Sequence, residues 1–124
     1  MGRSRLEIGI DCRDPPRLAS FWLAALGYEG TNGDGQPYLD LVAPAGAPAV
    51  YFQRVPEPKT VKNRLHFDLF SNEPEQLVER LADLGATRLG EPFGARPAWD
   101  WQVMADPEGN EFCVCREETP GGGR

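Results

Sequence analysis

Residues 6–27 read LEIGIDCRDPPRLASFWLAALG, and this stretch decides the fold. Its first seven residues alternate between apolar and polar side chains, which is the period of a half-buried strand. Asp14 and the two prolines after it predict a helix start, and Gly27 stands where such a helix ends. Between them, apolar residues recur at helical spacing at Leu18, Phe21, Trp22, Ala25 and Leu26. The stretch therefore predicts a strand and then an amphipathic helix that places Phe21 and Trp22 in the core.

A second copy of this pattern occurs in residues 65–85, which read LHFDLFSNEPEQLVERLADLG. Asn72 and Gly85 stand 58 residues after Asp14 and Gly27. We expect Asn72 to cap the second helix, because Pro74 follows in the first turn. The apolar stripe expected on this helix is Leu77, Leu81 and Leu84. The equal spacing indicates an internal duplication.

Each copy continues into further strands. The first half has a glycine-rich turn at 30–35 and then strand patterns at 38–43 and 50–55. The second half has weak strand signals near 86–90, a Pro/Gly loop at 91–98, and strand patterns at 101–105 and 111–116. Each half therefore reads βαβββ.

The expected fold is α+β, a single domain over residues 5–116. Its modules, about 5–55 and 64–116, are joined by a linker at 56–63, and residues 117–124 form a flexible tail. We expect a curved, mixed, eight-stranded sheet with the helices on its convex face. Side chains alternate between the two faces of a strand, so one set of strand residues should face the concave side, or cup, of the sheet. These residues are Glu7, Gly9, Asp11, Arg64, His66, Asp68 and Phe70.

Charge and composition exclude several classes of function. The chain has 124 residues, a formal net charge of −6 and a pI of about 4.8, so it lacks the basic face that nucleic acid binding requires. No apolar span is long enough for a membrane helix. One histidine cannot supply a site that needs two or three in one chain. Three cysteines, an odd number, argue against a disulfide framework and for the reducing cytoplasm.

The duplicated plan and several local motifs resemble the vicinal oxygen chelate superfamily, in its glyoxalase-like and bleomycin-resistance-protein-like branch. The most specific match is the turn and strand DPEGNEF at residues 106–112, and FQRVPEPK at residues 52–59 supports it. The resemblance covers about residues 5–116 and implies the glyoxalase/bleomycin resistance/dioxygenase fold. It also implies a small-molecule ligand and a homodimer.

The same resemblance implies four metal-ligand positions, one on each of the first, fourth, fifth and eighth strands. These positions fall at Glu7, Gln53, His66 and Cys113. Where metal-binding relatives usually have a glutamate, this chain has Cys113, so the divalent ion implied (Zn, Ni, Mn or Fe) has a degenerate site. Glu7 and His66 are the candidate catalytic residues, because a carboxylate and an imidazole can transfer protons. His66 is otherwise a structural histidine that forms a hydrogen bond with Asp68 or with a backbone group.

Further residues are candidates for contacting a ligand in the cup. Aromatic residues at a loop–strand junction, such as Trp99 and Trp101, form either the wall of a ligand pocket or a cover over the core. Lys59, Lys62 and Arg64 either attract an anionic substrate or belong to a solvated linker. The complete set of candidate ligand-binding residues is Tyr51, Gln53, Arg64, Asp68, Phe70, Trp99 and Trp101.

Two functions remain open at this point. The first is a metal-assisted lyase, isomerase or dioxygenase acting on a small oxygenated metabolite, in which the metal polarises the substrate oxygens. The second is a metal-free protein that binds or sequesters a small, antibiotic-like molecule. The missing fourth carboxylate favours the second function, and the retained ligand types at Glu7, Gln53 and His66 favour the first.

Overall fold

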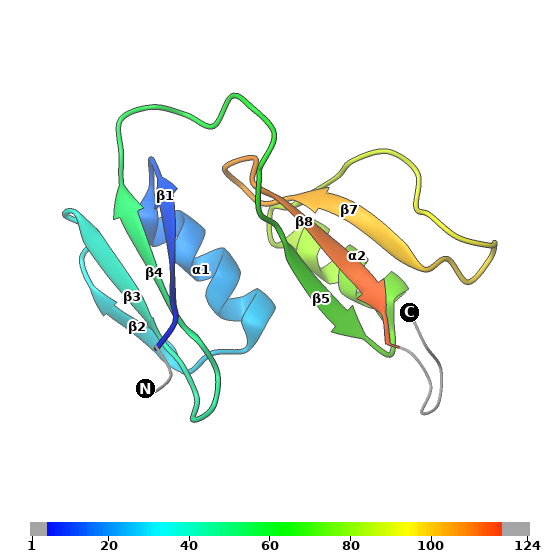
Figure 1. The fold of residues 1–124 in the computed structure, drawn as a ribbon, viewed down its shortest axis with the longest axis horizontal. Helices are drawn as coiled ribbons and strands as arrows, with labels where there is room; N and C mark the ends of the chain where they lie inside the picture. The colour runs from blue at the N-terminus through cyan, green and yellow to red at the C-terminus, as the bar shows by residue number, and fades with distance from the viewer. Residues whose placement is uncertain (1–4, 118–124) are drawn as a thin grey trace. The chain divides into compact units, whose positions relative to one another are not determined.

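The computed structural model describes residues 5–117 (Figure 1). The expected flexible tail therefore lies outside the described residues, apart from Glu117. The chain folds into two compact units that divide between Lys59 and Thr60. We call them the first and second modules and describe each by itself. In the described part of the chain, neither helix is long and apolar enough to cross a membrane.

The first module has one helix and a four-stranded mixed sheet (Figure 1). Its elements are β1 (Glu7–Cys12), α1 (Pro15–Leu26), β2 (Gly30–Gly33), β3 (Tyr38–Val42) and β4 (Ala49–Arg54). The strand order is β1-β4-β3-β2. The β1 strand runs parallel to β4, and the other pairs are antiparallel. This parallel pairing is possible because α1 and the two strands after it return the chain to the edge where β1 lies.

Local signals in the sequence fix both ends of α1. The side chain of Asp14 accepts a hydrogen bond from the backbone amide of Arg17 at 3.2 Å. Gly27 ends the helix with φ of 68°, a left-handed conformation that glycine adopts without strain. Phe21 and Trp22 are buried and meet edge to face, with ring centroids 5.2 Å apart. The predicted helix and its predicted core residues are confirmed.

The expected turn at 30–35 is wrong in its first half. Residues 30–33 form β2 and pair with β3, and the turn begins only after Gly33. In this edge strand the backbone supplies the pairing, and three of its four residues are exposed, so it needs no buried side chains. Because β2 contains two glycines and no apolar residue, its sequence lacks the hydrophobic alternation that predicts a strand.

The second module repeats the plan. Its elements are β5 (Phe67–Ser71), α2 (Pro74–Asp83), β6 (Thr87–Arg88), β7 (Trp101–Ala105) and β8 (Glu111–Arg116). The strand order β5-β8-β7-β6 matches that of the first module, again with the first and last strands parallel. The predicted α+β class with two βαβββ modules is thus confirmed, and its eight strands form two four-stranded mixed sheets.

The start of the second module differs from the expected pattern. Glu73, not Asn72, is the N-cap of α2, and the Ser71 hydroxyl accepts a hydrogen bond from the Glu73 amide at 3.0 Å. The strand starts at Phe67, so Leu65 lies outside the sheet and is 86% exposed. The buried stripe of α2 consists of Pro74, Val78 and Leu81, whereas Leu84 is 40% exposed. Val78 therefore belongs to the buried stripe of α2, and Leu84 is the C-cap residue at its end.

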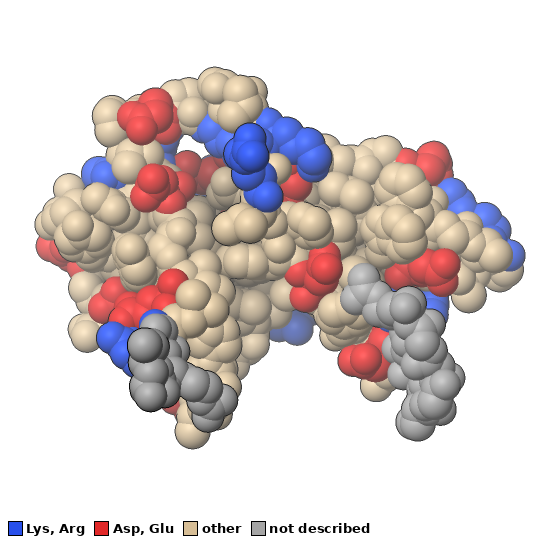
Figure 2. Space-filling view, in the orientation of Figure 1, with Lys and Arg blue, Asp and Glu red and all other residues tan. Residues whose placement is uncertain are grey.

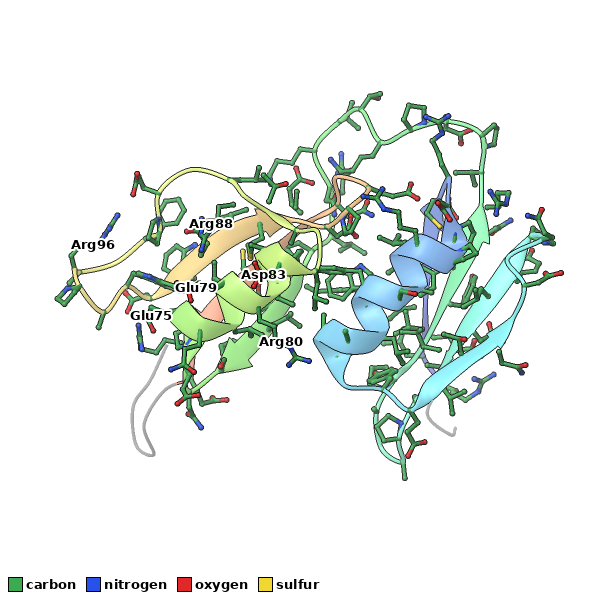
Figure 3. The ribbon with its side chains drawn as sticks, turned by 180° about the vertical axis from the view of Figure 1, so that it is seen from behind. Glu75, Glu79, Arg80, Asp83, Arg88 and Arg96 are labelled. Carbon is green, nitrogen blue, oxygen red and sulfur yellow. The ribbon has the colours of Figure 1, made fainter. Side chains whose placement is uncertain are left out.

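The polar side of α2 carries a line of acidic residues. Glu75, Glu79 and Asp83 follow one another along the helix, and Arg80 points away from them (Figure 3). Glu75 forms an ion pair with Arg116 of β8. Its own backbone amide and then Arg116 hold the pKa of Glu75 below its ordinary value. The helix lies against β8, β5 and β6 of the second module.

Candidate functional site

The candidate site lies on the open face of the second module, by which we mean the sheet face opposite α2. Three side chains meet there, from the start of β5 and from β8: His66, Asp68 and Cys113. Their ligand atoms all lie within 4.8 Å of one another. His66 Nε2 lies 3.2 Å from Asp68 Oδ1. We call these three residues the donor cluster.

Strand register brings the donor cluster together. Asp68 pairs directly with Cys113, because β5 and β8 are parallel neighbours. The turn before β8 fixes the antiparallel register of β8 with β7: the buried Asp106 carboxylate accepts hydrogen bonds from the amides of Glu108 and Asn110, at 2.9 and 3.0 Å. It also accepts from the Asn110 side chain. The DPEGN motif thus places Cys113 opposite Val103 of β7, and the pairing of β5 with β8 places it beside Asp68.

Electrostatics keep the Cys113 thiol protonated. Burial raises its pKa most, and the negative charge of Asp68 raises it further. A hydrogen bond to Asp68 acts in the same direction, since a thiol that donates to a carboxylate is stabilised in its neutral form. Lys62 opposes these effects with its positive charge. A metal ion at this site must therefore displace the thiol proton.

The donor cluster fits zinc better than the harder ions. An imidazole nitrogen, a carboxylate oxygen and a thiol sulfur are the three donor types that proteins use for zinc. In a tetrahedral zinc site the ligand atoms stand about 3–4 Å apart, close to the separations here. Mn²⁺ prefers oxygen donors, of which Asp68 is the one present in the cluster. The chain can thus offer zinc three ligands and leave a fourth position for another molecule.

The predicted metal ligands of the first module do not pair with each other. Glu7 pairs with Ala49 and forms an ion pair with Arg5. Gln53 pairs instead with Asp11. The alternation of β1 predicts that Asp11 faces the cup, but no functional role is predicted for it from the sequence. The structure thus brings His66 and Cys113 together with Asp68, while within the first module Gln53 has Asp11 as its neighbour on β1.

The candidate ligand-binding residues occupy different surroundings. Phe70 and Trp101 lie on the open face of the second module, each 40% exposed. Trp99 is 8% exposed, and the Arg116 guanidinium lies over its ring, 5.7 Å from the centroid. Tyr51 lies on the first module, where its ring passes over Gly9 of β1. Trp99 is thus covered by the Arg116 side chain. The rings of Phe70, Trp101 and Tyr51 can contact a ligand.

Basic residues border the donor cluster on the segment that leads into β5. Lys62 lies 3.9 Å from Glu111 at the start of β8, and Arg64 is exposed. Lys and Arg side chains are visible in this part of the molecule in Figure 2. Lys62 also acts electrostatically on Cys113, so the predicted basic cluster has at least one member close to the site.

Phe93 is a site residue that the sequence did not single out. Its ring stacks on Trp101, with centroids 4.9 Å apart and planes at 15°. A β-bridge joins the two residues. The available signal was weak: Phe93 is the one aromatic residue in the Pro/Gly loop at 91–98, and nothing in the spacing indicates that this loop folds back on β7.

Comparison with protein families gives one match over most of the chain. The family described as the glyoxalase-like domain matches residues 7–115. No curated protein sequence matches the chain.

Several solved structures share the fold at low identity. A glyoxalase/bleomycin resistance protein/dioxygenase family enzyme from Burkholderia phytofirmans PsJN is 22% identical with a TM-score of 0.67, covering 89% of this chain and 95% of that one. The fosfomycin resistance protein FosX from Listeria monocytogenes is 14% identical with a TM-score of 0.72, covering 95% and 94%. A mutant of that FosX has been solved with Mn(II) and 1S,2S-dihydroxypropylphosphonic acid. TioX from Micromonospora sp. ML1 is 17% identical with a TM-score of 0.58, covering 94% and 100%.

Proposed function

The chain belongs to the glyoxalase-like domain family, and we propose that it binds a small oxygenated molecule at a zinc ion held by His66, Asp68 and Cys113. The observation that carries this proposal is the proximity of the three donor atoms, all within 4.8 Å of one another. Glu7 and Gln53 stay candidate ligand residues of the first module taken by itself.

Zinc would polarise an oxygen of the bound molecule as a Lewis acid. Because zinc has no redox chemistry, this supports a lyase or isomerase rather than a dioxygenase. His66 would act as a zinc ligand rather than as a proton-transfer group while the ion is bound, and its Nε2 lies 3.2 Å from Asp68 Oδ1. Lys62 favours a molecule with a negative charge, since it is the cation that acts on Cys113.

A second function, metal-free binding or sequestration, is favoured by the protonation of Cys113. Its raised pKa and its hydrogen bond to Asp68 satisfy the thiol without a metal. In that case the open face binds its ligand through ring surface and the exposed cations. The two functions differ in one measurable property, which is the affinity for zinc.

Isothermal titration of the metal-free protein with Zn²⁺ tests the proposal. We expect one site of micromolar affinity or better, with binding weakened at least tenfold by each of Asp68→Asn, His66→Gln and Cys113→Ser. Glu79→Gln, on the opposite side of the second module, is the matched control and leaves zinc binding unchanged. Cys113→Glu replaces a soft donor with a hard one and shifts preference from Zn²⁺ to Mn²⁺. No zinc binding to the unaltered protein contradicts the proposal and favours metal-free binding.

We also propose that the protein works as a homodimer in the cytoplasm, with its two modules acting as one domain. Aromatic and aliphatic side chains of each module are at least 40% exposed, among them Tyr38 and Val42 of the first module and Phe70, Leu89, Phe93 and Trp101 of the second. A second subunit could cover part of this surface. The structure describes Cys12, Cys113 and Cys115, and none of them forms a disulfide, which suits a reducing compartment. Light scattering that gives the mass of a single 13.7 kDa chain at micromolar concentrations contradicts the dimer.

A further inference from the structure

A row of side chains crosses the open face of the second module beside the donor cluster. Phe70 of β5 pairs with Cys115 of β8, and Cys115 pairs with Trp101 of β7. On the other edge of β7, Phe93 pairs with Trp101 through a β-bridge. Paired residues share a face, so the row reads Phe70, Cys115, Trp101, Phe93. We call it the Cys115 row.

The Phe93 and Trp101 rings of this row stack in the direction that runs from one strand to the next. Phe93 and Trp101 are separated by 4.9 Å between centroids, with planes at 15°. Neighbouring strands are about 4.8 Å apart, so the stacking direction runs from strand to strand. Phe93 covers one face of Trp101 from the far edge of β7. The second face of Trp101 is therefore turned towards β8 and the position above Cys115.

Cys115 is the short member of the row. Its side chain ends well below the height of an aromatic ring, and the residue is 7% exposed between its taller neighbours. Phe70 stands on the next strand, about 4.8 Å beyond Cys115. A flat ring placed on Cys115 would contact Trp101 on one side and Phe70 on the other.

The backbone holds Phe93 in the row. The Phe93 amide donates to the Trp101 carbonyl at 2.8 Å, and the buried Gln102 side chain donates to the carbonyl of Gly90 at 3.1 Å. After Phe93, Gly94 turns the chain with φ of 108°. A Cβ on Gly94 would lie 2.6 Å from the Asp100 backbone nitrogen, so the turn accepts no side chain there.

We propose that the Cys115 row binds the planar ring of an arene carboxylate and directs its carboxylate at the donor cluster. Cys113 lies two residues along β8 from Cys115 on the same face, a separation of about 6.7 Å. A carboxylate oxygen lies about 3.7 Å from the centre of its benzene ring, and a zinc–oxygen bond adds about 2 Å. The span of the ligand matches the separation, and Lys62 supplies the complementary charge.

The inference rests on the proposed function, because the carboxylate is the molecule placed in the fourth position of the zinc ion. It goes further in naming the ligand class and the residues that select it. Ring stacking by Trp101 discriminates a flat ring from a saturated ring of the same charge.

The test compares 2-naphthoate with cyclohexanecarboxylate as probes on the zinc-treated protein, by calorimetry and indole fluorescence. We expect 2-naphthoate to bind at least tenfold more tightly and to change the fluorescence. Trp101→Leu should weaken 2-naphthoate about tenfold, within the range found when a stacked aromatic is removed, and leave cyclohexanecarboxylate unchanged. Trp101→Phe, which keeps a ring, should retain most of the affinity. Leu84→Ala, at an equally exposed apolar residue beyond α2, is the matched control.

Zinc titration of the same samples separates the two proposals. Equal affinity for the two probes, or 2-naphthoate binding that Trp101→Leu leaves intact, overturns the assignment of the Cys115 row. Absence of zinc binding contradicts the proposed function. Trp101-dependent binding of 2-naphthoate in that case still supports the row as the ring site.

Discussion

Gly9 of β1 and Tyr51 of β4 are partners in the strand register, and the Tyr51 ring occupies the space that a side chain on residue 9 would fill. A Cβ on Gly9 would stand 2.5 Å from both Cζ and the hydroxyl oxygen of Tyr51. The edge of the neighbouring Tyr38 ring also faces Tyr51, with centroids 6.2 Å apart. The glycine therefore determines where a half-buried tyrosine lies on the sheet of the first module.

The first prediction is an energetic coupling between Gly9 and Tyr51. Gly9→Ala forces the tyrosine ring aside, whereas Gly9→Ala in a Tyr51→Ala background meets no ring. A double-mutant cycle by urea unfolding should give a coupling free energy of about 0.5–3 kcal/mol. Gly30→Ala, on an edge strand with open space around its Cβ, is the control, and its effect should add to that of Tyr51→Ala. Additive effects at Gly9 would mean that the ring does not lie over β1.

The second prediction concerns the acid stability of the second module. The pKa of Glu75 is lowered in the folded state by its backbone amide and by Arg116, so its charged form stabilises the fold. That contribution is fully present above the ordinary value of 4.5 and is lost as the pH falls below it. Because the pair is partly exposed, we expect it to contribute about 0.2–1 kcal/mol.

Thermal unfolding of the unaltered protein and Glu75→Gln between pH 3 and pH 7 checks this sign. The stability difference should be largest near neutral pH and shrink below pH 4.5. Asp83→Asn, at the other end of α2 and without an observed ion pair to β8, serves as the comparison. A difference between the unaltered protein and Glu75→Gln that stays constant over the whole range would exclude Glu75 as an acid-sensitive group.

The third prediction concerns the reactivity of Cys113 in the metal-free protein. Burial and Asp68 raise the pKa of its thiol, and only the second cause can be removed by one substitution. Asp68→Asn removes the negative charge, so the pKa should fall and the thiolate fraction at pH 8 should rise. Alkylation by iodoacetamide, followed at Cys113 by peptide mass spectrometry, should be several-fold faster in Asp68→Asn. An unchanged rate would show that burial alone controls this thiol.

The fourth prediction concerns Gly94 and the ring that it positions. Gly94→Ala cannot keep the observed turn, because its Cβ would collide with the backbone of Asp100. Phe93 should leave its place on Trp101, and the affinity for 2-naphthoate should fall severalfold while zinc affinity is retained. Gly90→Ala, which also has a positive φ but meets nothing within 4 Å, separates backbone strain from the collision. Equal losses in both variants would count against a specific role for Phe93.

Much of the fold can be predicted from the sequence because its signals are local. Asp14 and Gly27 mark the ends of α1, and the alternation from Leu6 to Cys12 marks β1. The predictions from the sequence are wrong where tertiary packing or backbone geometry, rather than local residue type, determines the structure. β2 contributes hydrogen bonds and no core side chains, and the cap of α2 is set by the geometry of Glu73 rather than by the residue type at Asn72.

The candidate site could be predicted only in part. The family resemblance indicates His66 and Cys113, and the alternation puts Asp68 on the same face. That Asp68 stands beside Cys113 depends on the β5–β8 register, a contact between residues far apart in the sequence. The stacking of Phe93 on Trp101 depends on the path of a loop whose glycines allow many conformations. Such non-local relationships have no periodic signature in the chain.

Cobalt substitution tests the central claim, that His66, Asp68 and Cys113 bind one metal ion, most directly. Co²⁺ takes the place of Zn²⁺ and gives an intense near-ultraviolet charge-transfer absorption only when a thiolate binds it. We expect this absorption in the unaltered protein at one equivalent of cobalt, its loss in Cys113→Ser, and its retention in Cys12→Ser and Cys115→Ser. Absence of the absorption in the unaltered protein, or its persistence in Cys113→Ser, would contradict the account.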